Sequence, residues 1–396
     1  MLSQKFIDMT SQKSEIRNIA EYGAKRAAEI GYENVFDYSL GNPSVPAPDC
    51  VKEVLIELAQ NMSPVALHSY SPSLGIMSVK QDIAESLNRR FDMNYQGKNI
   101  FPVSGAAAAI AHAVRAVTVP EDEVITFAPH FPEYMPYINS SGAQLKVVPA
   151  DISNFQINFE EFEKMLNPKV MAILINTPNN PSGIVYSTET ILKLTEILAN
   201  KEKEYGHDIY IISDEPYREI IFGGVDAPFV SKYYANTIVC YSFSKSLSLP
   251  GERIGYIAVN PGCKDADLIV DMCGQISRGI GHNCPSSMMQ FAVAKCIDET
   301  SDISVYEENK NILYRELTRM GLDIVEPGGT FYIFPKALEE DARSFCQKAL
   351  KYDLLLVPSD SFGVPGHFRM AYCVPTEKVL RSIPVFEKFL KEEYGI

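Results

Sequence analysis

The sequence lacks closely spaced cysteines and histidines. Its eight cysteines are scattered over 396 residues without a CxxC pair, and its six histidines include no HExxH motif. Several cysteines lie in apolar runs, where a free thiol behaves as a small hydrophobic side chain. The pattern predicts reduced cysteines, a reducing compartment and no metal site.

Long hydrophobic runs and positive charge are also scarce. No stretch approaches 18 consecutive apolar residues, and residues 1–31 contain no apolar segment of the secretory type. The 36 lysines and arginines are outnumbered by 50 acidic residues, and the net charge of −14 disfavours nucleic acid or an anionic membrane as a partner. No GxGxxG follows a predicted strand, which disfavours a nicotinamide enzyme. We therefore expect a cytoplasmic protein.

Apolar runs typical of strands alternate with helical segments through the middle of the chain. Helices are predicted over 14–30, 49–61, 76–92 and 187–204, and strands over 123–129, 143–150, 170–178, 209–216, 237–244 and 253–260. Continuous apolar strands between helices predict an α/β fold with a mostly parallel sheet flanked by helices. Past residue 285 the pattern changes to long helices and short strands. We predict a large domain at 46–285, a smaller α+β domain at 286–396, and an N-terminal helix and arm at 1–45 that joins the small domain.

Three polar clusters follow predicted strands. Asn180, Asp214 and Lys245 are separated by 34 and 31 residues, about one strand-helix-strand unit each. In a parallel sheet they would meet at the carboxyl edge, where α/β proteins bind ligands. The set suits a pyridine aldehyde cofactor, because Lys245 could bond the aldehyde and Asp214 could pair with the ring nitrogen. Asn180 and Tyr217 could both donate to a ring oxygen.

Two further segments could hold the phosphate of such a cofactor. Ser242, Ser244 and Arg253 share the loop around Lys245 and could converge on one anion, although a solvated surface loop is the alternative. A turn at Gly105 opens an Ala-rich helix whose first amides are free, although this segment alone favours an ordinary helix start with nothing bound.

Eight motifs extend this pattern over nearly the whole chain. They are LGNP, YSPSLG, VSGAAAAI, APHFPEY, NTPNNPSG, SDEPY, SFSKSLSLPGERIGY and HFRMAY. In this order and spacing they resemble the aspartate aminotransferase superfamily, the fold type I pyridoxal-phosphate enzymes, in its class I/II aminotransferase branch. The resemblance implies the pyridoxal-phosphate-dependent transferase fold, pyridoxal 5'-phosphate as cofactor, and a homodimer with shared active sites.

The resemblance also implies roles for matching residues around the ring. Lys245 would bond the cofactor and later move the substrate proton, and Asp214 would pair with the pyridine nitrogen. Tyr217 and Asn180 would bind the ring oxygen, and Phe131 would stack on the ring face.

A second group would bind the anionic ends of cofactor and substrate. The residues implied for the phosphate are the amides of Gly105 and Ala106, the side chains of Ser242, Ser244 and Arg253, and Tyr70 reaching across from a neighbouring subunit. Arg369 would clamp the substrate α-carboxylate, helped by the backbone at Gly41.

Two positions bear on the substrate side chain. Ala106 stands where some aspartate-specific bacterial relatives carry a lysine, so that route to aspartate selectivity is missing. Arg278 lies near the position where other relatives carry an arginine that binds the side-chain carboxylate, although an ordinary surface arginine is at least as consistent.

The predicted function is that of an aminotransferase of amino acid metabolism, which moves the amino group of an L-amino acid to a 2-oxo acid by a ping-pong mechanism. One alternative is a C–S β-lyase on the same fold. The other is a non-catalytic pyridoxal-phosphate-binding regulator.

Overall fold

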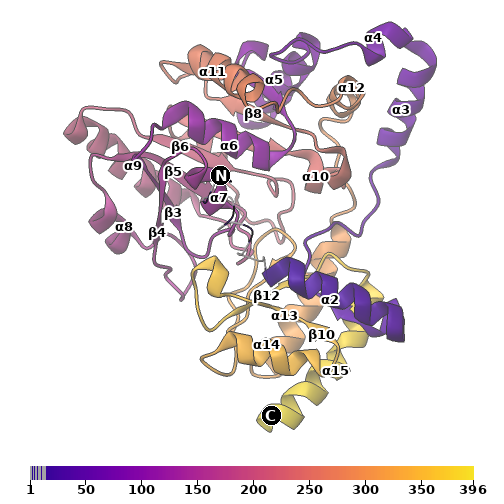
Figure 1. Cartoon of the computed structure of the whole chain (residues 1–396). Helices are drawn as coiled ribbons and strands as arrows, with labels where there is room; N and C mark the ends of the chain where they lie inside the picture. The colour runs from indigo at the N-terminus through magenta and orange to yellow at the C-terminus, as the bar shows by residue number, and fades with distance from the viewer. Residues whose placement is uncertain (1, 3, 5–6, 8–9, 11–14) are drawn as a thin grey trace.

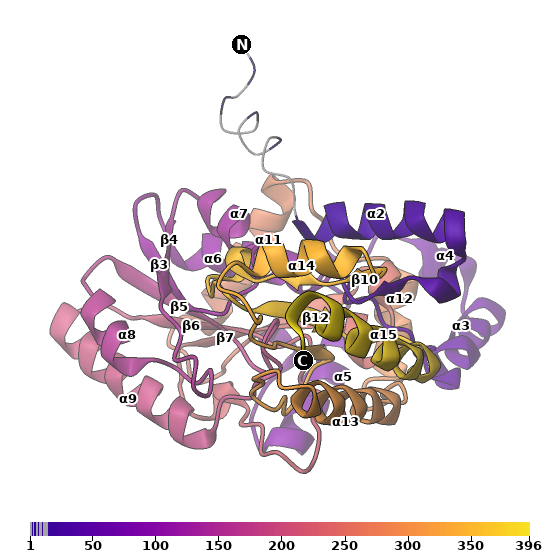
Figure 2. The same cartoon turned by 90° about the horizontal axis from the view of Figure 1, so that it is seen from below.

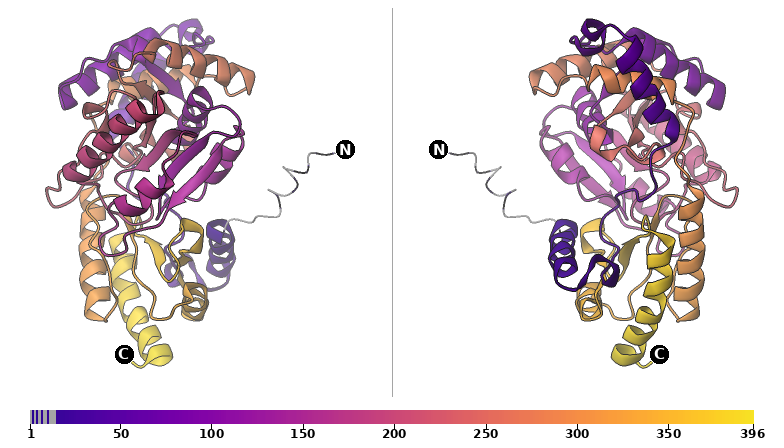
Figure 3. Two further views of the ribbon diagram at one scale, coloured as in Figure 1. Left: turned by 90° about the vertical axis from the view of Figure 1, so that its left-hand side faces the viewer. Right: turned by 90° about the vertical axis from the view of Figure 1, so that its right-hand side faces the viewer.

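The structure is a computed structural model that describes residues 2, 4, 7, 10 and 15–396. It has two lobes, one above the other in Figure 1 and seen from both sides in Figure 3. The large lobe comprises the central sheet with the helices between residues 49 and 295, and the small lobe combines residues 15–38 with residues 304–394. The first helix is α2 (Glu15–Ile30), and its predicted start at Ser14 lies outside the described residues.

The central sheet has seven strands in the order β2-β8-β7-β6-β5-β3-β4. They are β2 (Ile100–Val103), β3 (Glu123–Phe127), β4 (Gln144–Val148), β5 (Val170–Asn176), β6 (Tyr210–Asp214), β7 (Thr237–Ser242) and β8 (Gly255–Val259). Strands β3 to β7 run parallel, whereas β8 is antiparallel to both of its neighbours. The predicted α/β fold with a mostly parallel sheet is confirmed.

Helices cover both faces of this sheet. One face packs against α6 (Ala106–Val117), α7 (Tyr134–Asn139) and α11 (Ala266–Gly279). The other packs against α8 (Phe159–Met165) and α9 (Thr188–Tyr205) over one half, and over the other half against α3 (Asp49–Asn61), α4 (Pro64–His68), α5 (Met77–Phe91) and α12 (Ser287–Lys295). Successive strand residues point to opposite faces, so Cys240 and Tyr241 enter different cores. Burial on both faces explains the continuous apolar runs in the sequence.

The small lobe is built on short strands. Strands β11 (Val357–Pro358), β12 (Phe368–Ala371) and β9 (Tyr332–Ile333) form an antiparallel sheet, and β1 (Phe36–Asp37) pairs in parallel with β10 (Leu354–Leu355). Helices α13 (Ser304–Arg319), α14 (Ala342–Leu350) and α15 (Thr376–Tyr394) surround them. Helix α2 runs beside α14, where Arg343 Nε donates to Glu15 Oε1 at 2.8 Å (Figure 2).

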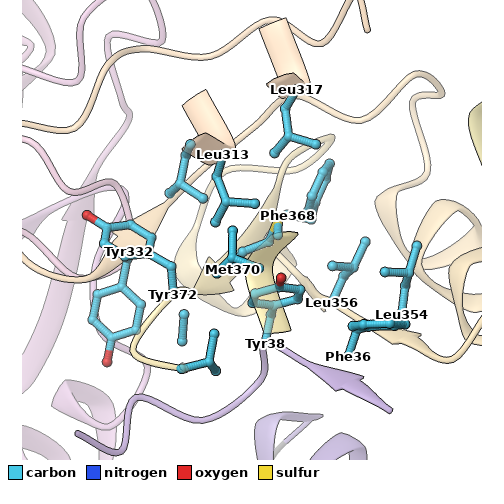
Figure 4. Close-up of a cluster of buried hydrophobic side chains, with 14 of the residues drawn as sticks. Phe36, Tyr38, Leu313, Leu317, Tyr332, Leu354, Leu356, Phe368, Met370 and Tyr372 are labelled. Carbon is cyan, nitrogen blue, oxygen red and sulfur yellow. The ribbon is translucent and has the colours of Figure 1, made fainter. Parts of the chain in front are cut away.

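The N-terminal arm is part of the small-lobe core. Figure 4 shows Phe36 and Tyr38 among Leu354, Leu356 and Phe368, and all five side chains are buried. The hydroxyl of Tyr38 also lies 2.7 Å from Ser382 Oγ in α15. The arm is therefore held by the C-terminal part of the chain rather than by the sheet that follows it in sequence.

Helix α12 bears on the position of the domain boundary. It begins at Ser287 but packs against α3, α4 and α5 of the large lobe. This packing favours a boundary between α12 and α13, and the predicted divisions at residues 45 and 285 stay predictions.

The structure also shows the state of the cysteines and whether side chains suited to a metal or a helix suited to a membrane are present. All eight cysteines are free. Within the described part of the chain, no three metal-binding side chains form a cluster, and no helix has the length and apolar character that a membrane crossing requires.

Candidate active site

A cavity of about 430 Å³ lies at the carboxyl ends of β5, β6 and β7, where the two lobes meet. Most of the predicted site residues line it. They are Gly41, Ala106, Phe131, Asn180, Asp214, Tyr217, Ser242, Ser244, Lys245, Arg253 and Arg369. The structure thus brings together side chains that are scattered over more than 300 positions of the sequence.

Lys245 lies in α10 (Phe243–Ser246), a single turn that begins where β7 ends. Its Nζ donates to the carbonyl oxygen of Gly41 at 2.6 Å. Burial lowers the pKa of the Lys245 amine to about 8, and the positive charges of Arg253 and Arg369 act in the same direction. A neutral amine is therefore accessible near neutral pH, as a nucleophile or proton acceptor requires.

Asp214 is the last residue of β6 and is 5% exposed. Its Oδ2 accepts a hydrogen bond from the hydroxyl of Tyr134 at 2.5 Å, and its buried Oδ1 has no partner among the described residues. Burial raises the pKa of this carboxyl to about 7, while the bond from Tyr134 opposes the shift. A buried acid with one unused oxygen suits a cationic partner that the protein itself does not supply.

Arg369, on β12, reaches from the small lobe into the cavity. Its Nη1 donates to Asn180 Oδ1 at 3.1 Å and its Nη2 to the carbonyl of Ser39 at 2.5 Å, while its guanidinium lies 4.7 Å from the ring centre of Tyr332. The side chain is 2% exposed, its Nε is unbonded, and it forms no ion pair within the described residues. A buried guanidinium without a carboxylate partner suits an external carboxylate.

Tyr217 and Asn180 lie on neighbouring walls of the cavity. The Tyr217 hydroxyl lies 3.2 Å from that of Tyr332, and burial raises the pKa of Tyr217 well above its usual value. The backbone N–H of Asn180 donates to Asn176 Oδ1 at 2.7 Å, which fixes the turn after β5. Both residues are thus protonated or neutral donors held in place by neighbours.

A further part of the cavity lining is polar and comes from Arg253, Ser242 and Ser244. Arg253 has a left-handed backbone (φ 51°), and its Nη2 reaches back to the carbonyl of Ser104 at 3.3 Å. The hydroxyls of Ser242 and Ser244 lie 2.7 Å apart. One cation and two hydroxyls beside the start of α6 make a site for an anion such as a phosphate.

Gly105 lies in the turn before α6, and its predicted role in phosphate binding stays a prediction. Its φ of 85° favours glycine, and a Cβ there would lie 3.0 Å from Arg253 Nη2, so the residue keeps the arginine close. Its N–H, however, donates to the carbonyl of Val103 at 2.8 Å. The amide of Ala106, the first residue of α6, is left open by its position in the helix.

Tyr70 and Arg278 lie away from this cavity. Tyr70 is fully exposed on the loop between α4 and α5. Arg278, in α11, lines a different pocket with Ser73 and Asp271. The single chain does not bring either residue to the site, so their roles stay predictions.

The sequence analysis did not single out several residues of the site. Asn176 donates from its Nδ2 to the carbonyl of Asp214 at 2.8 Å, and Tyr134 bonds the Asp214 carboxylate. Both lie in motifs quoted above. Asn176 is a polar residue at a strand end and Tyr134 is a polar residue one turn past Phe131, so the sequence could have marked both as candidates for the site. Ile16 and Tyr332 also line the cavity, but they come from the small lobe and no local pattern marks them.

The fold and this cavity define an aminotransferase of fold type I. The family of class I and II aminotransferases matches residues 33–383, and the chain belongs to this family. An aspartate aminotransferase from Thermotoga maritima is 31% identical over 384 residues, which are 95% of this chain and 97% of the relative. An aromatic-amino-acid aminotransferase from Thermococcus litoralis is 28% identical over 96% of each chain.

Solved structures give the same result. The crystal structure of an amino transferase from Eubacterium rectale has a TM-score of 0.97 and 46% identity, and covers 100% of this chain and 99% of its own. That of the Thermotoga maritima aspartate aminotransferase has a TM-score of 0.87 at 28% identity, over 98% of this chain and 100% of the other.

Proposed function

We propose that the protein is a pyridoxal 5'-phosphate-dependent aminotransferase that transfers the amino group of an L-amino acid to a 2-oxo acid by a ping-pong mechanism. The observation that carries this proposal is that one cavity holds two buried groups with an unused hydrogen-bonding atom, Asp214 Oδ1 and Arg369 Nε, together with the Lys245 amine.

The cavity residues fit the proposed cofactor. Asp214 would hold the protonated ring nitrogen, Tyr217 and Asn180 would donate to the ring oxygen, and Phe131 would face the ring. The residues assigned to the phosphate are Arg253, Ser242, Ser244 and the Ala106 amide, with Gly105 providing the space. When bound, this cofactor supplies an electron sink for the carbanion that forms at the substrate α-carbon.

The chain's own residues would then orient the substrate and move one proton. Arg369 would bind the α-carboxylate with its paired donors and so fix the Cα–H bond relative to the Lys245 amine. Lys245, with its pKa lowered to about 8, would accept that proton and pass it to the bound group, and would carry out the reverse transfer to the α-carbon in the second half-reaction. Asp214 would keep its ring partner protonated throughout, because an ionised carboxylate stabilises a neighbouring cation.

The finer parts of the proposal concern substrates and assembly. The relatives named above act, by their names, on aspartate or on aromatic amino acids, so these are the first donors to test. We also propose a cytoplasmic homodimer, in which the exposed Tyr70 reaches the phosphate of the neighbouring subunit.

A spectroscopic half-reaction tests the function. Purified protein loaded with pyridoxal phosphate is mixed with single L-amino acids, and the visible absorbance of the bound cofactor is followed. We expect one donor class to bleach this band and a 2-oxo acid to restore it, with no bleaching in Lys245→Ala. Release of pyruvate from a cysteine conjugate without an acceptor, in place of bleaching, would identify a β-lyase instead.

A further inference from the structure

We propose that Tyr134 is a positioning residue that acts through Asp214. Its hydroxyl occupies Oδ2 of the carboxylate, holds the group ionised and leaves Oδ1 alone to face the bound ring. The inference rests on the proposed function, since Asp214 is the proposed partner of the cofactor ring. It adds a role for Tyr134, which does not itself line the cavity.

The contact between Tyr134 and Asp214 is short and dry. The hydroxyl lies 2.5 Å from Oδ2, within the range of O–H···O⁻ bonds to an ionised acceptor. Tyr134 is 1% exposed and Asp214 is 5% exposed, so water does not compete for the bond. Because a tyrosine hydroxyl has a single proton to donate, that proton is committed to the carboxylate.

Local structure holds the tyrosine in place. Tyr134 opens α7, and its backbone N–H donates to the carbonyl of Phe131 at 3.1 Å. The two rings make an edge contact with centres 5.8 Å apart and planes at 84°. One turn of chain therefore positions both the side chain assigned to the ring face and the side chain that orients the acid.

The electrostatic surroundings make this bond consequential. Among the described residues, the ionisable groups that interact with Asp214 are Tyr134 and Tyr137 on α7, Glu215 and Tyr217 after β6, and Cys240 on β7. None of this group is a cation, although Lys245 and Arg253 line the same cavity, and the Glu215 charge raises the pKa of Asp214 further. The hydrogen bond from Tyr134 is the contribution that lowers this pKa. Without it, the acid would be neutral over a wider pH range and a poorer partner for a protonated ring nitrogen.

The test is a double-mutant cycle read by cofactor affinity. Pyridoxal phosphate is titrated into cofactor-free protein of Tyr134→Phe, Asp214→Asn and the double variant, and binding is followed by absorbance. We expect Tyr134→Phe to weaken binding by about 10-fold when Asp214 is present and by less than about 2-fold in the Asp214→Asn background. Equal losses in the two backgrounds would show a role in packing only and overturn the proposal.

The pH dependence of affinity gives a second readout. Affinity should rise as Asp214 ionises near pH 7, and in Tyr134→Phe this midpoint should move upward by about one unit. Tyr95→Phe is the matched control, because Tyr95 is also buried, its hydroxyl lies 2.5 Å from that of Ser231, and it does not line the cavity. It should leave both affinity and midpoint unchanged, and an unchanged midpoint in Tyr134→Phe would refute the proposal.

A subtler substitution covers the case in which Tyr134→Phe fails to fold. Site-specific 3-fluorotyrosine at position 134 keeps the ring and makes the hydroxyl a stronger donor, so the midpoint should move downward. A midpoint that stays in place would overturn the proposal. Failure of the unmodified protein to bind pyridoxal phosphate at all would instead overturn the proposed function.

Discussion

Nη1 of Arg369 lies 3.1 Å from Oδ1 of Asn180, and this hydrogen bond joins the small lobe to the turn after β5. The arginine proposed to bind the substrate carboxylate is therefore hydrogen-bonded to the amide proposed to bind the cofactor ring. Movement of either lobe would alter both contacts together, which couples the placing of the substrate to the placing of the ring.

Replacing Arg369 by lysine should reduce kcat/KM for amino acids by about 100-fold or more. Lysine keeps the charge but loses the planar fork that binds a carboxylate through two bonds. Steady-state kinetics would measure the loss, and the affinity of the cofactor-free variant for pyridoxal phosphate should change much less. A loss confined to cofactor affinity would contradict the assignment of Arg369 to the substrate carboxylate.

Replacing Arg253 by glutamine should weaken the binding of pyridoxal phosphate by about 10-fold or more, since a charge-assisted bond to phosphate is lost. Binding of pyridoxal, which lacks the phosphate, should be unaffected and serves as the internal control. Titration of cofactor-free protein with both aldehydes measures the two affinities. Equal weakening for the two ligands would contradict the assignment.

The addition of pyridoxal phosphate to the cofactor-free protein should accelerate as pH rises through about 8. Burial lowers the pKa of Lys245 to about 8, so the amine is cationic and unreactive below this pH and neutral above it. Stopped-flow absorbance at several pH values measures the rate, with Lys245→Arg as the unreactive control. A rate that keeps rising to pH 10 would mean that the amine has an ordinary pKa.

A buried ion pair behind the site should matter for stability. Arg218 Nε bonds Glu215 Oε2 at 2.6 Å, and both side chains are less than 10% exposed. Replacing Glu215 by glutamine would leave the buried guanidinium without its directly bonded carboxylate and should lower the free energy of unfolding by about 3 kcal/mol. Denaturant unfolding of the cofactor-free protein measures this change.

The exposed pair between Lys164 and Glu160 is the matched control for that experiment. Glu160→Gln should leave the unfolding midpoint unchanged, because solvent screens the pair. Combining Glu215→Leu with Arg218→Met should cost less than the two single changes together. An additive result would argue that the two residues act independently.

The sequence predicted the sheet and the residues at its strand ends because both are encoded locally. The predicted strands appear in the structure as β3 to β8, and Asn180, Asp214 and Lys245 line one cavity. The antiparallel direction of β8 could not be predicted from its apolar run, which is the same in either direction.

Contacts between distant segments were also beyond the sequence. Tyr134 reaches Asp214 across 80 positions, and Tyr332 meets Tyr217 across 115. No spacing rule links such pairs, because the first depends on the packing of α7 on the central sheet and the second on the packing of the two lobes. The bond between the Gly105 amide and the Val103 carbonyl likewise depends on a turn geometry that the motif alone does not specify.

The pairing of β1 with β10 has a consequence for the order in which the protein matures. Phe36 is synthesised early, but its strand partner Leu354 is synthesised 318 residues later. Gly41 and Arg369 both line the cavity, so the cavity is incomplete until Arg369 has been made. At ordinary rates of synthesis this delay is roughly 15–60 s. The nascent chain can build its sheet during that interval, yet the proposed cofactor can meet a complete site only once Arg369 has been synthesised.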